Sequence, residues 1–265
     1  MGRKALGAWA LLVYVFLYAP IAIVVLFAFN GGREALTWEG FSTKWFGEAL
    51  RDPSITEPFR NSLVIAGLNA VIACVLGTAL ALAVSRMRRR IRVPIDALVY
   101  MTLVTPEIVF GISALIFFVE VGISLGLKTI LISHVVFNAS IVALIVRARF
   151  VGMGQEFEEA SYDLGAGPLS TFRQVTLPRL APAIFAGGLL AFTFSFDDFI
   201  TSFFVAGAGA TTLPIRIFSS VRFGTSPVIN ATAVMILGLT IVAISIAYLV
   251  LRRSERRAPP VIPGV

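Results

Sequence analysis

Charged side chains are scarce in this sequence. Asp, Glu, Lys and Arg make up 14% of the 265 residues, whereas hydrophobic residues make up 57%. Soluble domains of ordinary composition carry about 25% charged residues, so the chain lacks the charge that covers a water-exposed surface. Together with a mean hydropathy of +0.89, this deficit predicts a protein embedded in lipid.

Cysteine and histidine each occur once. A lone cysteine excludes an intrachain disulfide and a cysteine-based metal site, and Cys74 lies in an apolar run, where we interpret it as a packing residue. Because His134 is the only histidine, a multi-histidine metal site is excluded as well. We interpret His134 as a polar helix residue with satisfied hydrogen bonds, the alternative being a functional role. The sequence therefore predicts no metal and no cofactor.

Motifs for catalysis are also missing. The sequence has no GxxxxGK[ST] phosphate loop, which excludes ATP binding by the usual P-loop route. It has no GxSxG, HExxH or CxxC pattern either. We therefore expect a protein that is not an enzyme.

Six stretches are long and apolar enough to cross a hydrocarbon core about 30 Å thick, which takes about 20 helical residues. They are Leu6–Phe29, Ser62–Val84, Ala97–Val119, Thr129–Val146, Ala183–Val205 and Ala231–Leu251. The sequence thus predicts an all-α integral membrane protein with six transmembrane helices. We expect the first segment to be retained rather than cleaved, because it is too long for the apolar region of a secretory signal.

The basic residues indicate which loops face the cytoplasm, because Lys and Arg gather in cytoplasmic loops. If the N-terminus is cytoplasmic, 15 of the 22 lysines and arginines lie inside and seven outside. Both termini are therefore expected in the cytoplasm. The net charge of +7 and the pI near 10.2 would fit a nucleic-acid-binding protein. The basic residues are spread over short segments next to the membrane rather than gathered on one face, so we exclude nucleic acid as a partner.

The chain is expected to divide into three parts. Residues 1–60 form the first transmembrane helix and an outer loop, residues 61–251 a core of five transmembrane helices, and residues 252–265 a cytoplasmic tail. The outer loop contains aromatic residues, including Trp38 and Trp45. We interpret them as an interfacial aromatic belt or, alternatively, as a contact surface for an external partner.

The longest polar interruption is a cytoplasmic loop at residues 147–182 of the core. It contains a run of glutamates up to Glu159, where a helix N-terminus favours negative charge. Gly165 is expected to end that helix in a left-handed conformation, Pro168 to lie in the first turn of a second helix and Pro178 to end it. By pattern alone the loop is either an amphipathic connector or a docking surface for a motor protein.

This loop resembles a known motif. Glu159-Ala160-Ser161, then Gly165 six residues after the glutamate, then Leu177-Pro178, is similar to the EAA loop of ABC importer permeases of the type I, MetI-like fold. Ser161 stands where that family most often has alanine, which is a change between small residues. In the family the loop forms coupling helices that insert into a groove of a separate ATPase. The resemblance implies this coupling role for Glu159, Ala160, Gly165, Leu177 and Pro178.

Within that family, the chain most resembles the spermidine/putrescine-type permeases, specifically the second of their two permease subunits. The segments that carry this resemblance are Trp38–Phe46, Thr105–Gly111 and above all Phe196–Phe204. It implies a multi-pass transport subunit of the bacterial inner membrane. It also implies two ATPase subunits, a second permease and an extracytoplasmic solute-binding protein as partners.

Two adjacent carboxylates lie in the fifth apolar segment. A carboxylate at the centre of a bilayer costs about 2.5–3.5 kcal/mol on insertion scales, so Asp197 and Asp198 need an explanation. On a continuous helix each would belong to a polar row, with Thr201 one turn after Asp197 and Ser202 one turn after Asp198. We interpret them as part of the solute pathway, the alternative being a structural role in hydrogen bonds or ion pairs between helices.

The third apolar segment contributes a further carboxylate. Glu107 follows Pro106, and Tyr100 lies seven residues before Glu107, on about the same face of a helix. Carboxylates together with aromatic rings suit a cationic organic solute through charge pairing and cation–π contact. The predicted pathway residues are Asp197, Asp198, Glu107, Tyr100 and Thr201.

These observations and the resemblance predict the permease subunit of an ATP-driven polyamine importer, forming half of the solute path. One alternative is an ABC permease for another small solute, such as a metal complex, an aminophosphonate or another organic cation. A second is a proton-driven secondary transporter that uses the same carboxylates, although it leaves the loop around Gly165 unexplained. A third is a membrane scaffold without transport activity.

Overall fold

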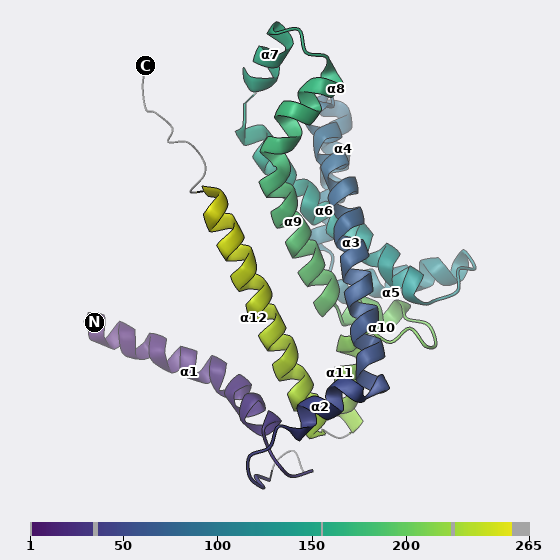
Figure 1. Cartoon of the computed structure of the whole chain (residues 1–265). Helices are drawn as coiled ribbons and strands as arrows, with labels where there is room; N and C mark the ends of the chain where they lie inside the picture. The colour runs from purple at the N-terminus through teal and green to yellow at the C-terminus, as the bar shows by residue number, and fades with distance from the viewer. Residues whose placement is uncertain (1, 34–36, 155, 224–225, 256–265) are drawn as a thin grey trace. The chain divides into compact units, whose positions relative to one another are not determined.

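A computed structural model describes residues 2–33, 37–154, 156–223 and 226–255. Over these ranges every regular element is a helix, and the strand-like pairing is one isolated bridge between Asn30 and Phe41 (Figure 1). The all-α expectation is confirmed. By contact the chain forms two compact units: one contains residues up to Thr56 and from Ile217 onward, the other Glu57–Arg216. Residues 256–265 of the expected cytoplasmic tail lie outside the described residues.

Four helical stretches among the described residues are long and apolar enough to cross a membrane. They are α1 (Arg3–Ala28), α3 (Pro53–Arg86), α6 (Leu127–Gly152) and the run Pro168–Asp197, in which α8 (Pro168–Thr171), the π-helical turn η1 (Phe172–Thr176) and α9 (Leu177–Asp197) follow one another. Helix α12 (Pro227–Glu255) is apolar over its first part, Pro227–Ile241.

The third expected span is broken in the structure. Helices α4 (Arg89–Val104) and α5 (Glu107–Glu120) meet at an angle of 108° and count as a fifth span only if the bent pair is taken together. Thr105 and Pro106 are extended at the break, with ψ of 127° and 134°. Proline disfavours helical backbone at the residue before it, so the expectation of one continuous helix over Ala97–Val119 is wrong.

The fifth expected span is broken as well. Helix α9 ends at Asp197, Asp198 is extended with ψ of 116°, and a short helix, α10 (Ile200–Val205), follows. The expected continuous helix Ala183–Val205 is therefore wrong, and so are the two polar rows that depended on it. The backbone N–H of Ser202 donates to Asp198 Oδ1 at 2.7 Å. This bond satisfies a donor at the start of α10, because the first N–H groups of a helix have no partner within it.

The cytoplasmic loop forms two short helices that meet at Gly165. Helix α7 (Glu156–Asp163) ends before Gly165, which has the expected left-handed φ of +84°. Pro168 opens α8, also as expected. The expectation that Pro178 ends the second helix is wrong. Pro178 lies in the first turn of α9, directly after the π-helical turn, where a missing N–H is tolerated.

In the unit Glu57–Arg216, helices α3, α6 and α9 pack through small residues. A Cβ on Gly77 of α3 would lie 2.7 Å from the carbonyl oxygen of Ala139 and from Val142 Cβ, both on α6. Val142 is fully buried and also faces Gly187 of α9. Side chains of this size allow three helices to approach closely without the hydrophobic effect that drives packing in water.

In the other unit, α2 (Lys44–Arg51) and α12 pack together, and α1 packs against α12. Buried Ala49, Ile55 and Ile229 form its small core. The outer loop is ordered around buried Asn30, whose carbonyl oxygen accepts a hydrogen bond from Trp45 Nε1 at 2.7 Å. Helix α11 (Leu213–Phe223) begins within Glu57–Arg216 and ends among the residues of this unit.

We predict that Gly77→Ala lowers the stability of the protein by about 1–3 kcal/mol, because the added methyl group overpacks the contact between α3 and α6. The matched control is Gly67→Ala on the same helix, where a Cβ has nothing within 4 Å. The measurement is the midpoint of thermal unfolding in detergent. Equal midpoints for the two variants would contradict the close packing.

Candidate functional site

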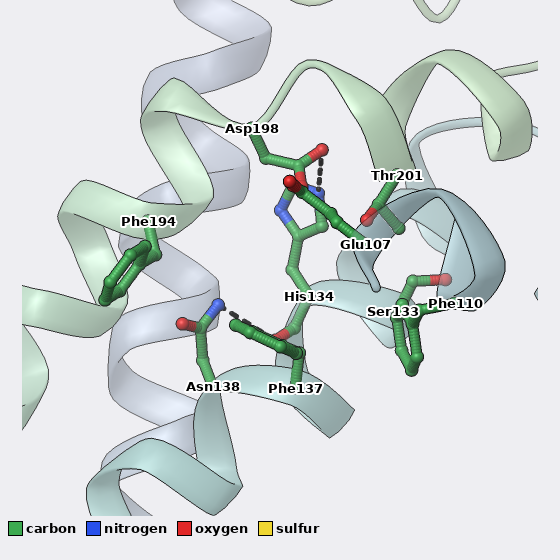
Figure 2. Close-up of a pocket in the computed structure, with 9 residues that line it drawn as sticks. All are labelled: Glu107, Phe110, Ser133, His134, Phe137, Asn138, Phe194, Asp198 and Thr201. Atoms are coloured by element: carbon green, nitrogen blue, oxygen red, sulfur yellow. Dashed lines mark hydrogen bonds and ion pairs between the residues drawn. The ribbon is translucent and has the colours of Figure 1, made fainter. Parts of the chain in front are cut away.

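The two helix breaks lie next to each other. Helix α5, which starts directly after the first break, packs on α10, which starts directly after the second. The contact is close because Gly111 of α5 has no side chain. A Cβ there would lie 2.9 Å from the Phe204 ring and 3.4 Å from Thr201 Cα. Glu107, in the first turn of α5, and Asp198, just before α10, are thereby brought to one place (Figure 2).

A small cavity of about 40 Å³ lies at this place. Figure 2 shows the side chains around it, from α5, α6, α9 and the segment at α10. The lining residues are Glu107, Phe110, Ser133, His134, Phe137, Asn138, Phe194, Asp198 and Thr201. A water molecule needs about 10–15 Å³ by this measure, so the cavity holds a few waters or a group of similar size.

His134 of α6 holds Asp198 in position. Its Nε2 lies 3.3 Å from Asp198 Oδ1 and 3.1 Å from Ser202 Oγ, and its Nδ1 lies 2.7 Å from Ser195 Oγ. The His134 side chain is 3% exposed and that of Asp198 11%. A neutral imidazole satisfies this arrangement if Nε2–H donates to the carboxylate and the Ser195 hydroxyl donates to Nδ1. The contact ties α6 to the break between α9 and α10.

A second set of polar contacts continues from His134 to α3. Asn138 Nδ2 donates to the His134 carbonyl oxygen at 2.9 Å and faces Asn69 Oδ1 at 3.4 Å, while Asn69 Nδ2 donates to the Ala191 carbonyl oxygen at 2.8 Å. Asn138 Oδ1 is buried and has no hydrogen-bond partner among the described residues. A buried acceptor without a donor costs about 1–3 kcal/mol, and this oxygen is enclosed by the surrounding protein.

The wall of the cavity is rich in acidic and aromatic side chains. Two carboxylates and no lysine or arginine are among the lining residues described by the structure, and three phenylalanine rings complete the wall. Carboxylates attract a cation by charge and aromatic faces by their quadrupole. These side chains can therefore bind a small cationic group. The lining residues include no constellation of side chains for acyl or phosphoryl transfer.

The structure separates the five predicted pathway residues into two groups. Glu107, Asp198 and Thr201 line the cavity, whereas Asp197 is exposed at the last position of α9 and is not part of the lining. Tyr100 lies on α4, before the 108° bend, and is 53% exposed. The expectation that Tyr100 and Glu107 share one helical face is wrong, because they belong to different helices.

Sequence reasoning missed His134 and Asn138 as members of the site. His134 had been interpreted as a satisfied helix residue, and its ring nitrogens are indeed partnered, but by the groups that form the cavity wall. The signal was present in the sequence: residues 134 and 138 are four apart, so they share one face of an otherwise apolar helix. The sequence did not indicate that α5, α9 and the segment at α10 would pack against this face of α6 and form the cavity with it.

The predicted coupling residues lie at one end of the same unit, on α7, in the turn between α7 and α8, and at the start of α9 (Figure 1). One side of α7 is tied to the helices behind it. Glu158 accepts a hydrogen bond from Thr176 Oγ1 at 2.6 Å and pairs with Arg86 at 3.3 Å, and the Arg179 guanidinium carbon lies 3.2 Å from the centre of the Phe157 ring. These contacts join α7 to α3, η1 and α9.

The other side of this region faces outward. Glu159, Ala160 and Gly165 are exposed, and so are Leu177 and Pro178 at the start of α9. Leu164 and Leu169, at 89% and 69% exposure, are its most exposed large apolar side chains. Large exposed apolar residues next to a helix that is held in place by side-chain contacts are typical of a contact surface for another protein.

A protein family matches most of the chain. The model of this family, described as "binding-protein-dependent transport system inner membrane component", matches residues 53–256. The chain is 40% identical over 254 residues to the putrescine transport system permease protein PotI of Escherichia coli (strain K12), covering 93% of this chain and 90% of that protein. It is 35% identical over 256 residues to the spermidine/putrescine transport system permease protein PotC of the same organism, covering 97% of both.

Solved structures agree with the fold. A chain from a bacterial ABC transporter that imports the acidic polysaccharide alginate matches 96% of this chain, and 98% of its own length, with a TM-score of 0.69 and 18% identity. A chain of the inward-facing MetNI methionine ABC transporter matches 75% of this chain, and 94% of its own length, with a TM-score of 0.63 and 19% identity. The expectation of an ABC importer permease fold is confirmed.

We predict that His134→Ala and Asp198→Asn are coupled in their effects on stability. Removing one partner of a buried hydrogen bond leaves the other group unsatisfied, at a cost of about 1–3 kcal/mol. His134→Ala should therefore destabilise the Asp198→Asn protein less than the unchanged protein, by at least about 1 kcal/mol. The measurement is thermal unfolding of the four proteins in detergent. A control set of four proteins uses Glu120→Gln in place of Asp198→Asn, because Glu120 is an exposed carboxylate at the end of α5. If the effects of His134→Ala and Asp198→Asn are as additive as those of His134→Ala and Glu120→Gln, the contact is contradicted.

Proposed function

This chain belongs to the family of binding-protein-dependent transport system inner membrane components, and we propose that it forms half of the translocation path of an ATP-driven polyamine importer. It is a multi-pass protein of the bacterial inner membrane and acts as a transport subunit, with ATP hydrolysis carried out by a separate ATPase partner.

The observation that carries the cargo proposal is the acidic, aromatic-lined cavity at the two helix breaks. Polyamines are flexible organic cations, and Glu107 with Asp198 supplies two carboxylates to pair with them beside three phenylalanine rings. The names of PotI and PotC refer to putrescine and to spermidine and putrescine. Asp197, Thr201 and Tyr100 remain proposed pathway residues, with Thr201 at the cavity and the other two outside its lining.

The proposed topology has six spans and both termini in the cytoplasm. In this arrangement residues 1–60 contribute the first span and an outer loop, residues 61–251 the permease core with coupling loop 147–182, and residues 252–265 the cytoplasmic tail. The bent pair α4–α5 counts as the third span and α12 as the sixth. The uneven distribution of lysine and arginine supports this orientation.

The proposed assembly contains two ATPase subunits, a second permease and an extracytoplasmic solute-binding protein. The exposed side of α7 and α8, with Glu159, Ala160 and Gly165, would dock on an ATPase, and Leu177 with Pro178 would join this surface to α9. Because Glu158 and Phe157 tie α7 to Arg86 and Arg179 behind it, a displacement of the docked loop moves α3 and α9 with it.

A displacement of helices can open or close a solute site at a break in a membrane helix. Helix α9 runs from the proposed coupling loop to Asp198, so the proposed ATPase-docking surface and the proposed cation site lie at opposite ends of one helix. In the present structure the cavity of about 40 Å³ is too small for a whole diamine. Transport then needs a second conformation in which the site is open, and ATP-driven closure of the motors would shift the population between the two.

We predict that the reconstituted complex takes up labelled putrescine or spermidine only with ATP, and that Asp198→Asn lowers uptake at least about tenfold, because a charge-assisted hydrogen bond to the cation is lost. The control is Glu120→Gln at equal abundance. Uptake that unlabelled polyamines in large excess do not inhibit would point to another cargo. Uptake without ATP would point to a secondary transporter.

We predict that Gly165→Val prevents co-purification of the ATPase while membrane insertion is unchanged. A β-branched residue resists the left-handed φ of +84° at a cost of about 1–2 kcal/mol, and this turn sets the angle between α7 and α8. Gly167→Val is a matched control, because Gly167 is also exposed with open space around it but has an ordinary φ of −74°. If the Gly165 variant retains as much ATPase as the Gly167 variant, the docking role is refuted.

A further inference from the structure

Between α8 and α9 the chain passes through a turn that bends easily. Helix α8 ends at Thr171, the π-helical turn η1 follows, and α9 begins at Leu177. The backbone N–H of Leu177 donates to the carbonyl oxygen of Phe172, one residue further back than in an α-helix. Pro178 has no N–H, so the Gln174 carbonyl lacks the donor that a regular α-helix would supply. Helices bend mostly at prolines and π-helical turns, so a force on α8 would bend the run at η1.

A hydrogen bond from α7 bypasses this turn. Thr176, the last residue of η1, is fully buried, and its Oγ1 donates to Glu158 Oε1 of α7 at 2.6 Å. A hydroxyl bond of this length to a carboxylate is charge-assisted and about twice as strong as a neutral one. It joins α7 to the residue directly before α9, at the same end of the unit (Figure 1). A displacement of α7 therefore reaches α9 without passing through α8 and η1.

The other contacts of α7 with the helices behind it are more exposed. Arg86 Nη2 lies 3.3 Å from Glu158 Oε1, but the Arg86 side chain is 58% exposed, against 17% for Glu158. The Phe157 ring, which the Arg179 guanidinium covers, is 44% exposed. Water and salt screen such contacts. The buried hydrogen bond to Thr176 is therefore the firmest connection between α7 and the start of α9.

A second hydrogen bond of the same loop gives a matched comparison. Ser161 Oγ of α7 lies 3.0 Å from Thr171 Oγ1 of α8. Thr171 and Thr176 are equally well buried, at 1% and 0% exposure. Both threonines thus place a hydroxyl against α7, but Thr171 lies before η1 and Thr176 at its end. Of these two contacts, the one at Thr176 alone spans the turn.

We propose that Glu158 is a positioning residue for energy coupling: by holding Thr176, it prevents η1 from absorbing the displacement of the docked loop, so that the motor drives α9. This role rests on the proposed docking of an ATPase on the loop. It differs from docking itself, because the Glu158 side chain contacts the helices behind α7, whereas Glu159 is exposed on the other side. Loss of Glu158 should leave the ATPase bound and active while less solute is moved for each ATP hydrolysed.

The first test measures putrescine uptake and ATP hydrolysis in the same proteoliposomes, which contain the complex that co-purifies with the chain. Thr176→Val, which removes the hydroxyl and keeps the shape, should lower uptake per ATP hydrolysed at least about fivefold, because a hydrogen bond to a charged group is lost. Glu158→Ala should do the same. Glu158→Gln, which still accepts a hydrogen bond, should recover most of the ratio, and Thr171→Val should leave it unchanged.

A merely structural role would not change this ratio, because misfolded complexes lose uptake and hydrolysis together. Glu158→Ala combined with Thr176→Val should lower the ratio no further than Glu158→Ala alone, because both changes remove the same contact. An unchanged ratio in Thr176→Val and Glu158→Ala would overturn the proposal. So would an equal decrease in Thr171→Val and Thr176→Val.

The second test needs neither cargo nor ATPase. Tyr162→Cys on α7 and Leu190→Cys on α9 supply two exposed positions for spin labels in the full chain, and Cys74→Ala removes the native thiol. Electron paramagnetic resonance in nanodiscs then gives the distribution of distances between the labels. Thr176→Val should broaden this distribution, because η1 is then free to bend, whereas Thr171→Val should not. Equal widths in the two variants would contradict the bypass.

The outcomes separate this role from the proposed function, and Glu158→Ala, at a partly exposed position, serves both tests if Thr176→Val does not fold. If the unchanged complex takes up no putrescine but either variant broadens the distance distribution, the polyamine cargo is wrong and the bypass of η1 stands. If uptake per ATP is normal in both variants and the distribution stays narrow, the importer stands and Glu158 is not a positioning residue.

Discussion

The contact between His134 and Asp198 is the interaction on which the rest of the core depends. A membrane gives no water to exposed polar groups, so broken helices survive within it only where protein satisfies the freed backbone and charges. Asp198 satisfies the start of α10 through the Ser202 N–H, and His134 in turn holds Asp198. Gly111 lets α5 approach α10 closely enough for Glu107 to reach the same place. Two breaks, each unfavourable alone, are thus stabilised by meeting each other.

The same helix connects this site to the other end of the unit. Helix α9 begins at the exposed loop of α7 and α8 and ends one residue before Asp198. Its start is fixed to α7 through Arg179 and Phe157, and its middle to α6 through Gly187 and Val142. A rigid element between a docking surface and a helix break gives a physical route by which a partner's movement alters the cavity. This route accounts for a separate motor acting on a chain that has no phosphate loop of its own.

The helices themselves could be predicted from the sequence, because long apolar runs and the left-handed Gly165 are local features. The breaks could not. Pro106 is expected to perturb a helix, but the sequence does not give the bend of 108°. Asp198 lies in an apolar run that is consistent with a continuous helix, and only tertiary contacts show that the helix ends there. For the same reason Tyr100 was grouped with Glu107, and His134 was left out of the site. Carboxylates were a sound guide to where the site lies, but their partners come from residues distant in sequence, which only the folded chain brings together.

The central claim is that the cation binds where the two breaks meet. Cryo-electron microscopy of the assembled importer, trapped with putrescine and an ATP analogue that is not hydrolysed, tests it most directly. The account predicts density for one amino end of the diamine beside Glu107 and Asp198, in a cavity wider than the one of about 40 Å³ seen in the present structure. Putrescine bound elsewhere along the path, with the His134–Asp198 contact and the closed cavity unchanged, would contradict it.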